Sequence, residues 1–129
     1  MAWTYDRGMG SETDTESSPA ETDLWSQIRS EDGKTARRAG RQLIAAYHDE
    51  QLRKLLDHLR EGFEQLDAGE IDAFEMDELV HRYHRCAQKL WSFCGSSGGQ
   101  WLQAAKNLAY YRSQGDEPDW WEVGAPRRR

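Results

Sequence analysis

The chain has 129 residues, of which 37% are hydrophobic and 31% are charged. This length and composition suit one soluble domain with a modest core, and no apolar run approaches the roughly 20 residues of a membrane span. The first residues lack the basic and then apolar pattern of a secretory signal, so we expect a cytoplasmic protein that has no membrane partner.

Composition divides the chain into three parts. Residues 1–17 are rich in glycine, serine, threonine and acids and show no periodicity, which predicts a disordered acidic arm. Residues 18–115 carry helical periodicity, which predicts an all-α domain, and residues 116–129 are expected to form an extended tail with tryptophan and arginine. The net charge of −6 comes entirely from residues 1–33, which hold eight acids and two bases.

The first predicted helix is a short one, over residues 19–30. Ser18 is a typical N-cap, Pro19 suits the first helical position, and Glu21 occupies the third position, where it completes a capping box. Its apolar side is expected to carry Leu24, Trp25 and Ile28.

A helical hairpin over residues 35–66 and 73–94 is the predicted centre of the fold. The connection between these helices is short, so we expect them to be antiparallel neighbours. Asp72 is placed to cap the second helix, Glu75 to complete a capping box, and Gly95 to end the helix in a left-handed conformation.

Apolar spacing predicts which sides of the hairpin helices face each other. In residues 35–66 the phase of the pattern slips near residues 48–50, which predicts a kink or a break. Gly62 falls within the apolar seam, where a missing side chain would admit a large side chain from the facing helix. In residues 73–94 the apolar positions recur every three or four residues, which predicts this inward face: Met76, Val80, Tyr83, Ala87, Leu90 and Cys94.

Residues 98–113 are predicted to form a third packing helix, with Ser97 at its cap. In the tail that follows, Pro118 precedes the pair Trp120 and Trp121, and an extended segment is expected there. Adjacent residues of an extended chain point to opposite sides. One tryptophan is therefore expected to bury on the domain while the other faces outward.

The two cysteines are interpreted as core residues. Cys86 and Cys94 stand eight positions apart on one predicted helix, about 12 Å at the usual rise, so they cannot form a disulfide with each other. Neither belongs to a C-x-x-C motif. We expect buried thiols that act as small apolar side chains, and no cofactor.

The histidines offer the clearest candidates for enzyme chemistry. His58 and His84 are expected to flank the hairpin seam at similar heights, and together with Asp77 they could supply three metal ligands. Arg53 and His58 have the spacing of the Arg-x4-His motif of certain helical ribonucleases. The alternative interpretation is that these side chains are partly exposed and have no catalytic role.

Charge is concentrated in two clusters. Lys34, Arg37, Arg38 and Arg41 form a basic turn that could contact phosphate, since no acid lies between them. No recognition-helix pattern or aromatic platform accompanies this turn in the sequence, so nucleic acid is not the expected partner. Residues 61–78 hold eight acids and no base, and such a negative hairpin end could attract a basic protein.

The leading functional hypothesis is a non-enzymatic protein-interaction or regulatory module, of the kind that includes antitoxin-like partner proteins. Two long helices and one short one leave apolar surface uncovered, which predicts a homodimer or a stable complex with another protein. The alternatives are a histidine-dependent helical enzyme, either metal-binding or RNA-cleaving, and nucleic-acid binding through the basic turn. Aromatic residues are favoured at binding hot spots, so the predicted contact residues are Trp101, Tyr110, Tyr111, Trp120 and Trp121.

Overall fold

The computed structural model describes residues 19–95 and 98–126. Throughout these residues the regular structure is α-helical, which confirms the all-α prediction. Among the described helices, none is both long enough and apolar enough to cross a bilayer. Three parts of the chain lie outside the described residues: the predicted disordered arm at residues 1–17, the predicted caps Ser18 and Ser97, and residues 127–129.

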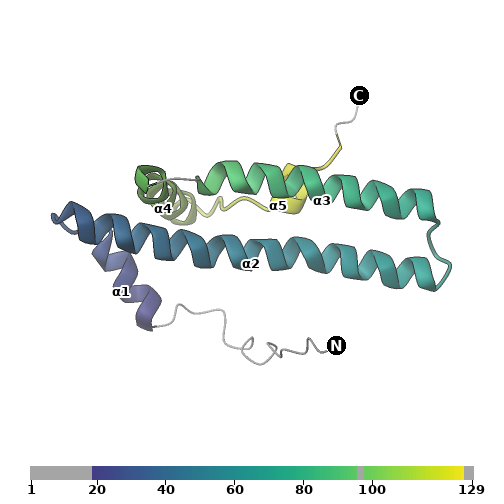
Figure 1. Cartoon of the computed structure of the whole chain (residues 1–129), viewed down its shortest axis with the longest axis horizontal. Helices are drawn as coiled ribbons and strands as arrows, with labels where there is room; N and C mark the ends of the chain where they lie inside the picture. Colours follow the sequence, from purple (N-terminus) through teal and green to yellow (C-terminus); the bar gives the residue numbers. More distant parts are fainter. Residues whose placement is uncertain (1–18, 96–97, 127–129) are drawn as a thin grey trace.

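The long axis of the molecule is formed by two helices that lie side by side and run in opposite directions (Figure 1). The helices are α1 (Pro19–Gln27), α2 (Gly33–Asp67), α3 (Ala73–Cys94), α4 (Gly98–Ser113) and α5 (Trp120–Val123). A short connection joins α2 and α3 at one end, here called the hairpin tip, while α1 and α4 pack near the start of α2. The fifth helix, α5, packs against α3.

Helix ends follow the capping signals of the sequence. The Asp72 carboxylate accepts from the Glu75 amide at 2.9 Å, and the Glu75 carboxylate accepts from the Asp72 amide at 2.9 Å, which confirms the predicted capping box. Gly95 ends α3 with a φ of 77°. Asp32 caps α2, which begins at Gly33, two residues before the predicted start at residue 35. The Asp32 carboxylate accepts from the Thr35 hydroxyl at 2.6 Å.

The predicted break at residues 48–50 is wrong, because α2 is one continuous helix, and Figure 1 shows no sharp kink in it. Tyr47 and Gln51 are buried on either side of this stretch. Between them, the ring of His48 packs edge-on against that of Trp91, with centroids 4.4 Å apart. Asp49 pairs with Arg53 one turn later at 2.8 Å instead of capping a new helix. Tertiary contacts therefore keep α2 in phase through a stretch with a weak apolar pattern.

The core lies where α2, α3 and α4 meet. Most of its side chains are small or branched, which allows the three helices to approach closely. Phe93 of α3 adds an aromatic layer, because its ring packs against those of Tyr47 and Trp120 at centroid distances of 6.0 and 5.3 Å. The buried residues at this junction are Ala39, Leu43, Ile44, Tyr47, Leu90, Cys94, Ala104, Ala105 and Leu108.

The prediction of an extended segment at Trp120 and Trp121 is wrong, because these residues begin α5. Asp119 caps this helix, and its carboxylate accepts from the amides of Trp121 and Glu122. A helical turn separates neighbouring side chains by about 100°, not by 180°, so both indole rings can face the domain. Trp120 is buried, and its indole nitrogen donates to the Tyr47 hydroxyl at 2.8 Å.

Two glycines of α2 allow other helices to approach. A side chain at Gly40 would meet the backbone of α4, with its Cβ 2.9 Å from the Leu102 Cα. A side chain at Gly62 would meet the ends of two side chains of α3, at 2.8 Å from Leu79 Cδ1 and 2.9 Å from Met76 Sδ. The prediction that Gly62 admits a large side chain of the facing helix is therefore confirmed.

Replacing each of these glycines with alanine should have different effects. Gly40→Ala should lower the free energy of unfolding by about 1–3 kcal/mol, because the backbone of α4 must move. Gly62→Ala should cost less, since the ends of Leu79 and Met76 can rotate and alanine favours a helix by about 1 kcal/mol. Chemical unfolding of both variants measures the difference, and an unchanged or raised stability for Gly40→Ala would contradict the close packing of α4.

Stability should also fall at high pH because of Tyr47. Burial raises the pKa of this phenol from 10.0 to about 12, while the hydrogen bond from Trp120 opposes the shift. Below pH 10 the phenol is protonated in both states. Between pH 10 and 12 the unfolded chain loses the proton and the folded chain keeps it, so the unfolded state is favoured as pH rises. Urea unfolding at stepped pH should show this loss, Tyr47→Phe should reduce it, and Tyr110→Phe, at an exposed position, should leave it in place.

Candidate functional site

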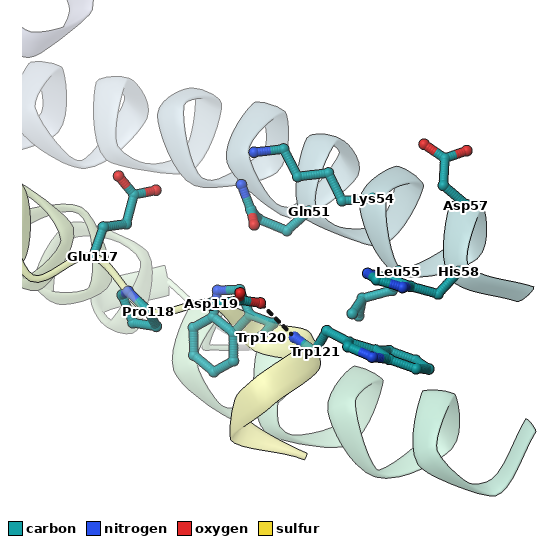
Figure 2. Close-up of a pocket in the computed structure, with 10 residues that line it drawn as sticks. All are labelled: Gln51, Lys54, Leu55, Asp57, His58, Glu117, Pro118, Asp119, Trp120 and Trp121. Atoms are coloured by element: carbon teal, nitrogen blue, oxygen red, sulfur yellow. Dashed lines mark hydrogen bonds between the residues drawn. The ribbon is translucent and has the colours of Figure 1, made fainter. Parts of the chain in front are cut away.

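A groove lies between α2 and the segment that leads into α5 (Figure 2), with a volume of about 590 Å³. Polar side chains line it from both sides. Figure 2 shows the ring of His58 lying flat over the indole of Trp121, while the carboxylate of Asp57 points away from α5. The Asp119 carboxylate accepts from the Trp121 amide at 3.1 Å, so it is engaged at the start of α5.

Trp121 is held between α2 and α3. On one side the His58 ring stacks on it, with centroids 4.1 Å apart and planes within 3°. On the other side the Arg82 guanidinium lies 4.2 Å from the ring centroid. Arg82 also donates two hydrogen bonds to the Trp121 carbonyl oxygen, at 3.1 and 2.9 Å. These contacts give both His58 and Arg82 a role in fixing α5.

The structure does not gather the predicted metal ligands. Asp77 lies beside His81, one turn along α3, at 3.5 Å, and His58 stacks on Trp121. His84 is exposed on α3. Within residues 19–95 and 98–126, no group of three or more histidine, cysteine or acidic side chains could hold a metal ion. The proposed trio fails because packing against α5 orients His58 independently of Asp77.

The thiols are placed as core side chains. Burial raises the pKa of Cys94 to about 12 and raises the pKa of Cys86 as well. A thiol that keeps its proton at neutral pH is a poor nucleophile and a poor metal ligand. Both cysteines are free and buried, which confirms the interpretation drawn from their spacing.

His48 is a half-buried histidine that the sequence did not single out. Its Nε2 atom is buried and has no hydrogen-bond partner within the described part of the chain. Desolvation lowers the pKa of this imidazole, so the neutral ring is favoured in its contact with Trp91. The contact joins α2 to α3, and the i, i+4 patterns of a single helix could not have indicated it.

The basic turn has an aromatic neighbour that is distant in the sequence. Trp101 of α4 lines a shallow hollow together with the four basic side chains, and the Arg41 guanidinium lies 5.8 Å from its ring centroid. Nothing in the sequence near this turn indicates this neighbour, because Trp101 follows Arg41 by 60 positions. Because α4 packs closely on Gly40 of α2, it brings Trp101 next to the basic turn.

The predicted contact residues serve the fold to different degrees. Trp120 is buried in the core, and Trp121 is half-buried between His58 and Arg82. Trp101 and Tyr111 are also half-buried. Tyr110 is 61% exposed and is the member of this set most available to a partner.

A different set of apolar side chains remains uncovered on the hairpin. Leu56, Phe63, Val80 and Trp91 are 44%, 50%, 39% and 55% exposed. The prediction that Val80 faces inward is wrong, because its side chain is exposed. Leu79, one residue earlier, is the side chain that meets Gly62 at the seam, which turns Val80 away from it.

These four side chains lie on the same side of the hairpin. Each directly follows a residue that is buried at the seam or contacts it, namely Leu55, Gly62, Leu79 and Leu90. One step along a helix is a rotation of about 100°. Because α2 and α3 are antiparallel neighbours, the same rotation on both helices turns these side chains to a common side. We call Leu56, Phe63, Val80 and Trp91 the open face.

The opposite side of the hairpin is the one that α5 covers. His58 and Arg82 follow Leu55 and Leu79 by three positions, a rotation of about 300°, which places them on the other flank of the seam. Their contacts with Trp121 show that α5 lies there. The open face is therefore the flank of the hairpin that α5 leaves uncovered. The signal in the sequence was an apolar stripe on residues 52–66 that is wider than one partner helix can cover.

The contacts of Arg82 should be necessary for the docking of α5. Arg82→Gln removes charged hydrogen bonds to the Trp121 carbonyl oxygen, each worth about 1.5–3 kcal/mol, and the contact with the indole face. We expect a lower unfolding temperature and faster hydrogen exchange in residues 120–124. His81→Gln, at an exposed neighbouring position, is the matched control and should change neither. Unchanged exchange at α5 in Arg82→Gln would contradict this role.

Comparison of the chain with known protein families, with curated proteins and with solved structures found no match to any of them.

Proposed function

We propose that this protein is a small interaction module whose contact surface is the open face of the α2–α3 hairpin. The observation that carries the proposal is the exposure of four large apolar side chains on one side of two packed helices. A helix pair is a stiff platform, and apolar side chains held on such a platform gain free energy when a partner removes them from water.

The form of the surface supports protein binding over small-molecule chemistry. Leu56 and Phe63 are two helical turns apart on α2, and the contacts of Gly62 with Leu79 place Val80 beside them on α3. The result is an elongated apolar strip, and an amphipathic helix is a suitable occupant for such a strip. The edges are polar, with the exposed residues Asp49, Arg53 and His84 nearby, as is typical of the rim of a protein interface.

The histidine-dependent enzyme has less support from the geometry. The histidines are dispersed: His48 packs on Trp91, His58 on Trp121, His81 contacts Asp77, and His84 is exposed. In the groove beside α5, the His58 ring stacks on Trp121 and helps to hold α5 in place. An interaction or regulatory role accounts for more of the exposed apolar surface than a catalytic one does.

The proposal is tested by affinity capture with variants of the open face. Leu56→Glu and Phe63→Glu place charges where a partner would exclude water, so a partner recovered in stoichiometric amount with the wild-type chain should be lost. That partner is either another protein or a second, differently tagged copy of this chain. Quantitative mass spectrometry of the captured material is the measurement.

Phe74→Glu is the matched control. Phe74 is 82% exposed at the start of α3, which makes it the most exposed of the large apolar side chains described, yet it does not belong to the open face. The control should retain the partner, and circular dichroism should show that all three variants keep their helices. If both open-face variants recovered the same proteins as the wild type, the proposed contact surface would be wrong.

A further inference from the structure

The flank of α2 that carries the open face continues towards the start of the helix. Residues seven positions apart return to nearly the same side of an α-helix. Counting back from Leu59 in steps of seven gives Leu52, Ala45 and Arg38, and Arg41 lies four positions before Ala45. Ala45, Arg38 and Arg41 are exposed, as Leu56 and Phe63 are.

This flank therefore changes character along its length. It is basic at the start of α2, apolar through its second half, and acidic where the chain turns into α3. Asp67 and Glu70 are exposed at the hairpin tip, in a stretch of the sequence, residues 61–78, that has eight acids and no base. Opposite charges thus stand at the two ends of an apolar strip. A molecule with this pattern is complementary to a copy of itself turned end for end.

The centres of the side-chain patterns on α2 and α3 lie at the same level along the hairpin. On α2 the centre of the pattern lies between Leu52 and Leu56. Since His48 touches Trp91 and Gly62 touches Leu79, this point of α2 is level with the midpoint between Val80 and Trp91 on α3. One two-fold axis can therefore act on both helices at once.

From this coincidence, and as a more specific form of the proposed function, we propose that the open face binds a second copy of this chain. The two hairpins would lie face to face and antiparallel, forming a four-helix arrangement in which α2 crosses over α2 and α3 over α3. The axis brings Leu52 to Leu56, Phe63 to Ala45, and Val80 to Trp91 of the second copy.

The same axis pairs the charged ends. Asp67 at the tip of one copy lies level with Arg41 of the other, and Glu70, in the turn after α2, lies at the same end as Arg38. Each dimer contains this set of pairs twice, once at either end. A nucleic acid would satisfy the basic turn but would be repelled by the acidic tip and would leave the apolar strip exposed, so the second copy fits more of the surface.

Charge reversal at one end tests the arrangement. Variant A carries Arg38→Glu and Arg41→Glu, and variant B carries Asp67→Arg and Glu70→Arg. In a dimer of A, or in a dimer of B, like charges meet at both ends. In a mixed dimer of A with B, opposite charges meet at both ends. We expect the wild type to be dimeric, each variant alone to dimerise about tenfold or more weakly, and an equal mixture to form the A–B dimer.

Sedimentation equilibrium of the full chain gives the dissociation constants, and native mass spectrometry identifies the A–B species by its mass. The matched controls are Lys106→Glu and Asp116→Arg, exposed charges outside the open face and both charged ends, which should leave dimerisation unchanged. Circular dichroism checks that every variant is folded. Raising the salt concentration should weaken the wild-type dimer, because the end pairs are exposed and therefore screened.

Several results would overturn the inference. A wild-type chain that stays monomeric, while Leu56→Glu and Phe63→Glu lose a different captured protein, would exclude the second copy and leave the proposed function in place. A wild-type dimer that is indifferent to A, B and the open-face variants would place the interface elsewhere and exclude both. A mixture of A and B that remains monomeric would exclude the antiparallel arrangement. Binding of an oligonucleotide by a monomeric wild type, lost in A and kept in B, would assign the basic turn to nucleic acid.

Discussion

The length of α2 is the constraint on which the rest of the structure depends. A helix of 35 residues is about 50 Å long, and the other helices are too short to surround it. Its first half is covered by α1, α3 and α4, which bury Leu43, Ile44 and Tyr47 at their junction. Its second half has α3 on one side and α5 at one flank. An amphipathic helix that projects beyond its core must leave part of its apolar stripe in contact with water.

The final helix determines which flank is left open. A four-residue helix has little stability of its own, so α5 depends on its contacts with the hairpin. Trp120 enters the core and donates to Tyr47, while Trp121 lies between His58 and Arg82. These contacts close one flank of the α2–α3 seam and give the histidine of that flank a structural partner. Apart from Phe74 near the tip, the large exposed apolar side chains described on the hairpin are consequently on the other flank.

This arrangement links the charge distribution to the proposed assembly. The acidic hairpin tip and the basic start of α2 are separated by most of the length of a helix, so they do not neutralise each other within one copy. The antiparallel pairing that we propose would bring each tip to a basic turn and cover the apolar strip between them. The same pairing would explain why surface aromatic and aliphatic residues persist on a chain that is otherwise rich in charge.

Much of the local structure follows from the sequence. The capping pair Asp72 and Glu75 and the positive φ of Gly95 are properties of short segments, and local chemistry determines them. The close approach at Gly62 and the burial of the thiols were predictable from apolar spacing, because both lie on the apolar face of a helix. The continuity of α2 past Asp49 was not predictable in this way, because the packing of His48 on Trp91 and the burial of Tyr47 and Gln51 outweigh the local signal.

Tertiary structure alone decided which of two adjacent side chains points into the seam between α2 and α3. Leu79 and Val80 are both apolar and both fit the spacing of the seam, and a rotation of about 100° separates the half-buried Leu79 from the exposed Val80. The position of α5 likewise depends on partners about 40 to 70 residues away, Arg82 and Tyr47, which no local pattern connects to it. By itself the sequence therefore determined the ends of α2, α3 and α4 to within two residues. The packing of distant helices decided where α5 forms and which apolar surface remained for a partner, because burial depends on neighbours that the local pattern does not specify.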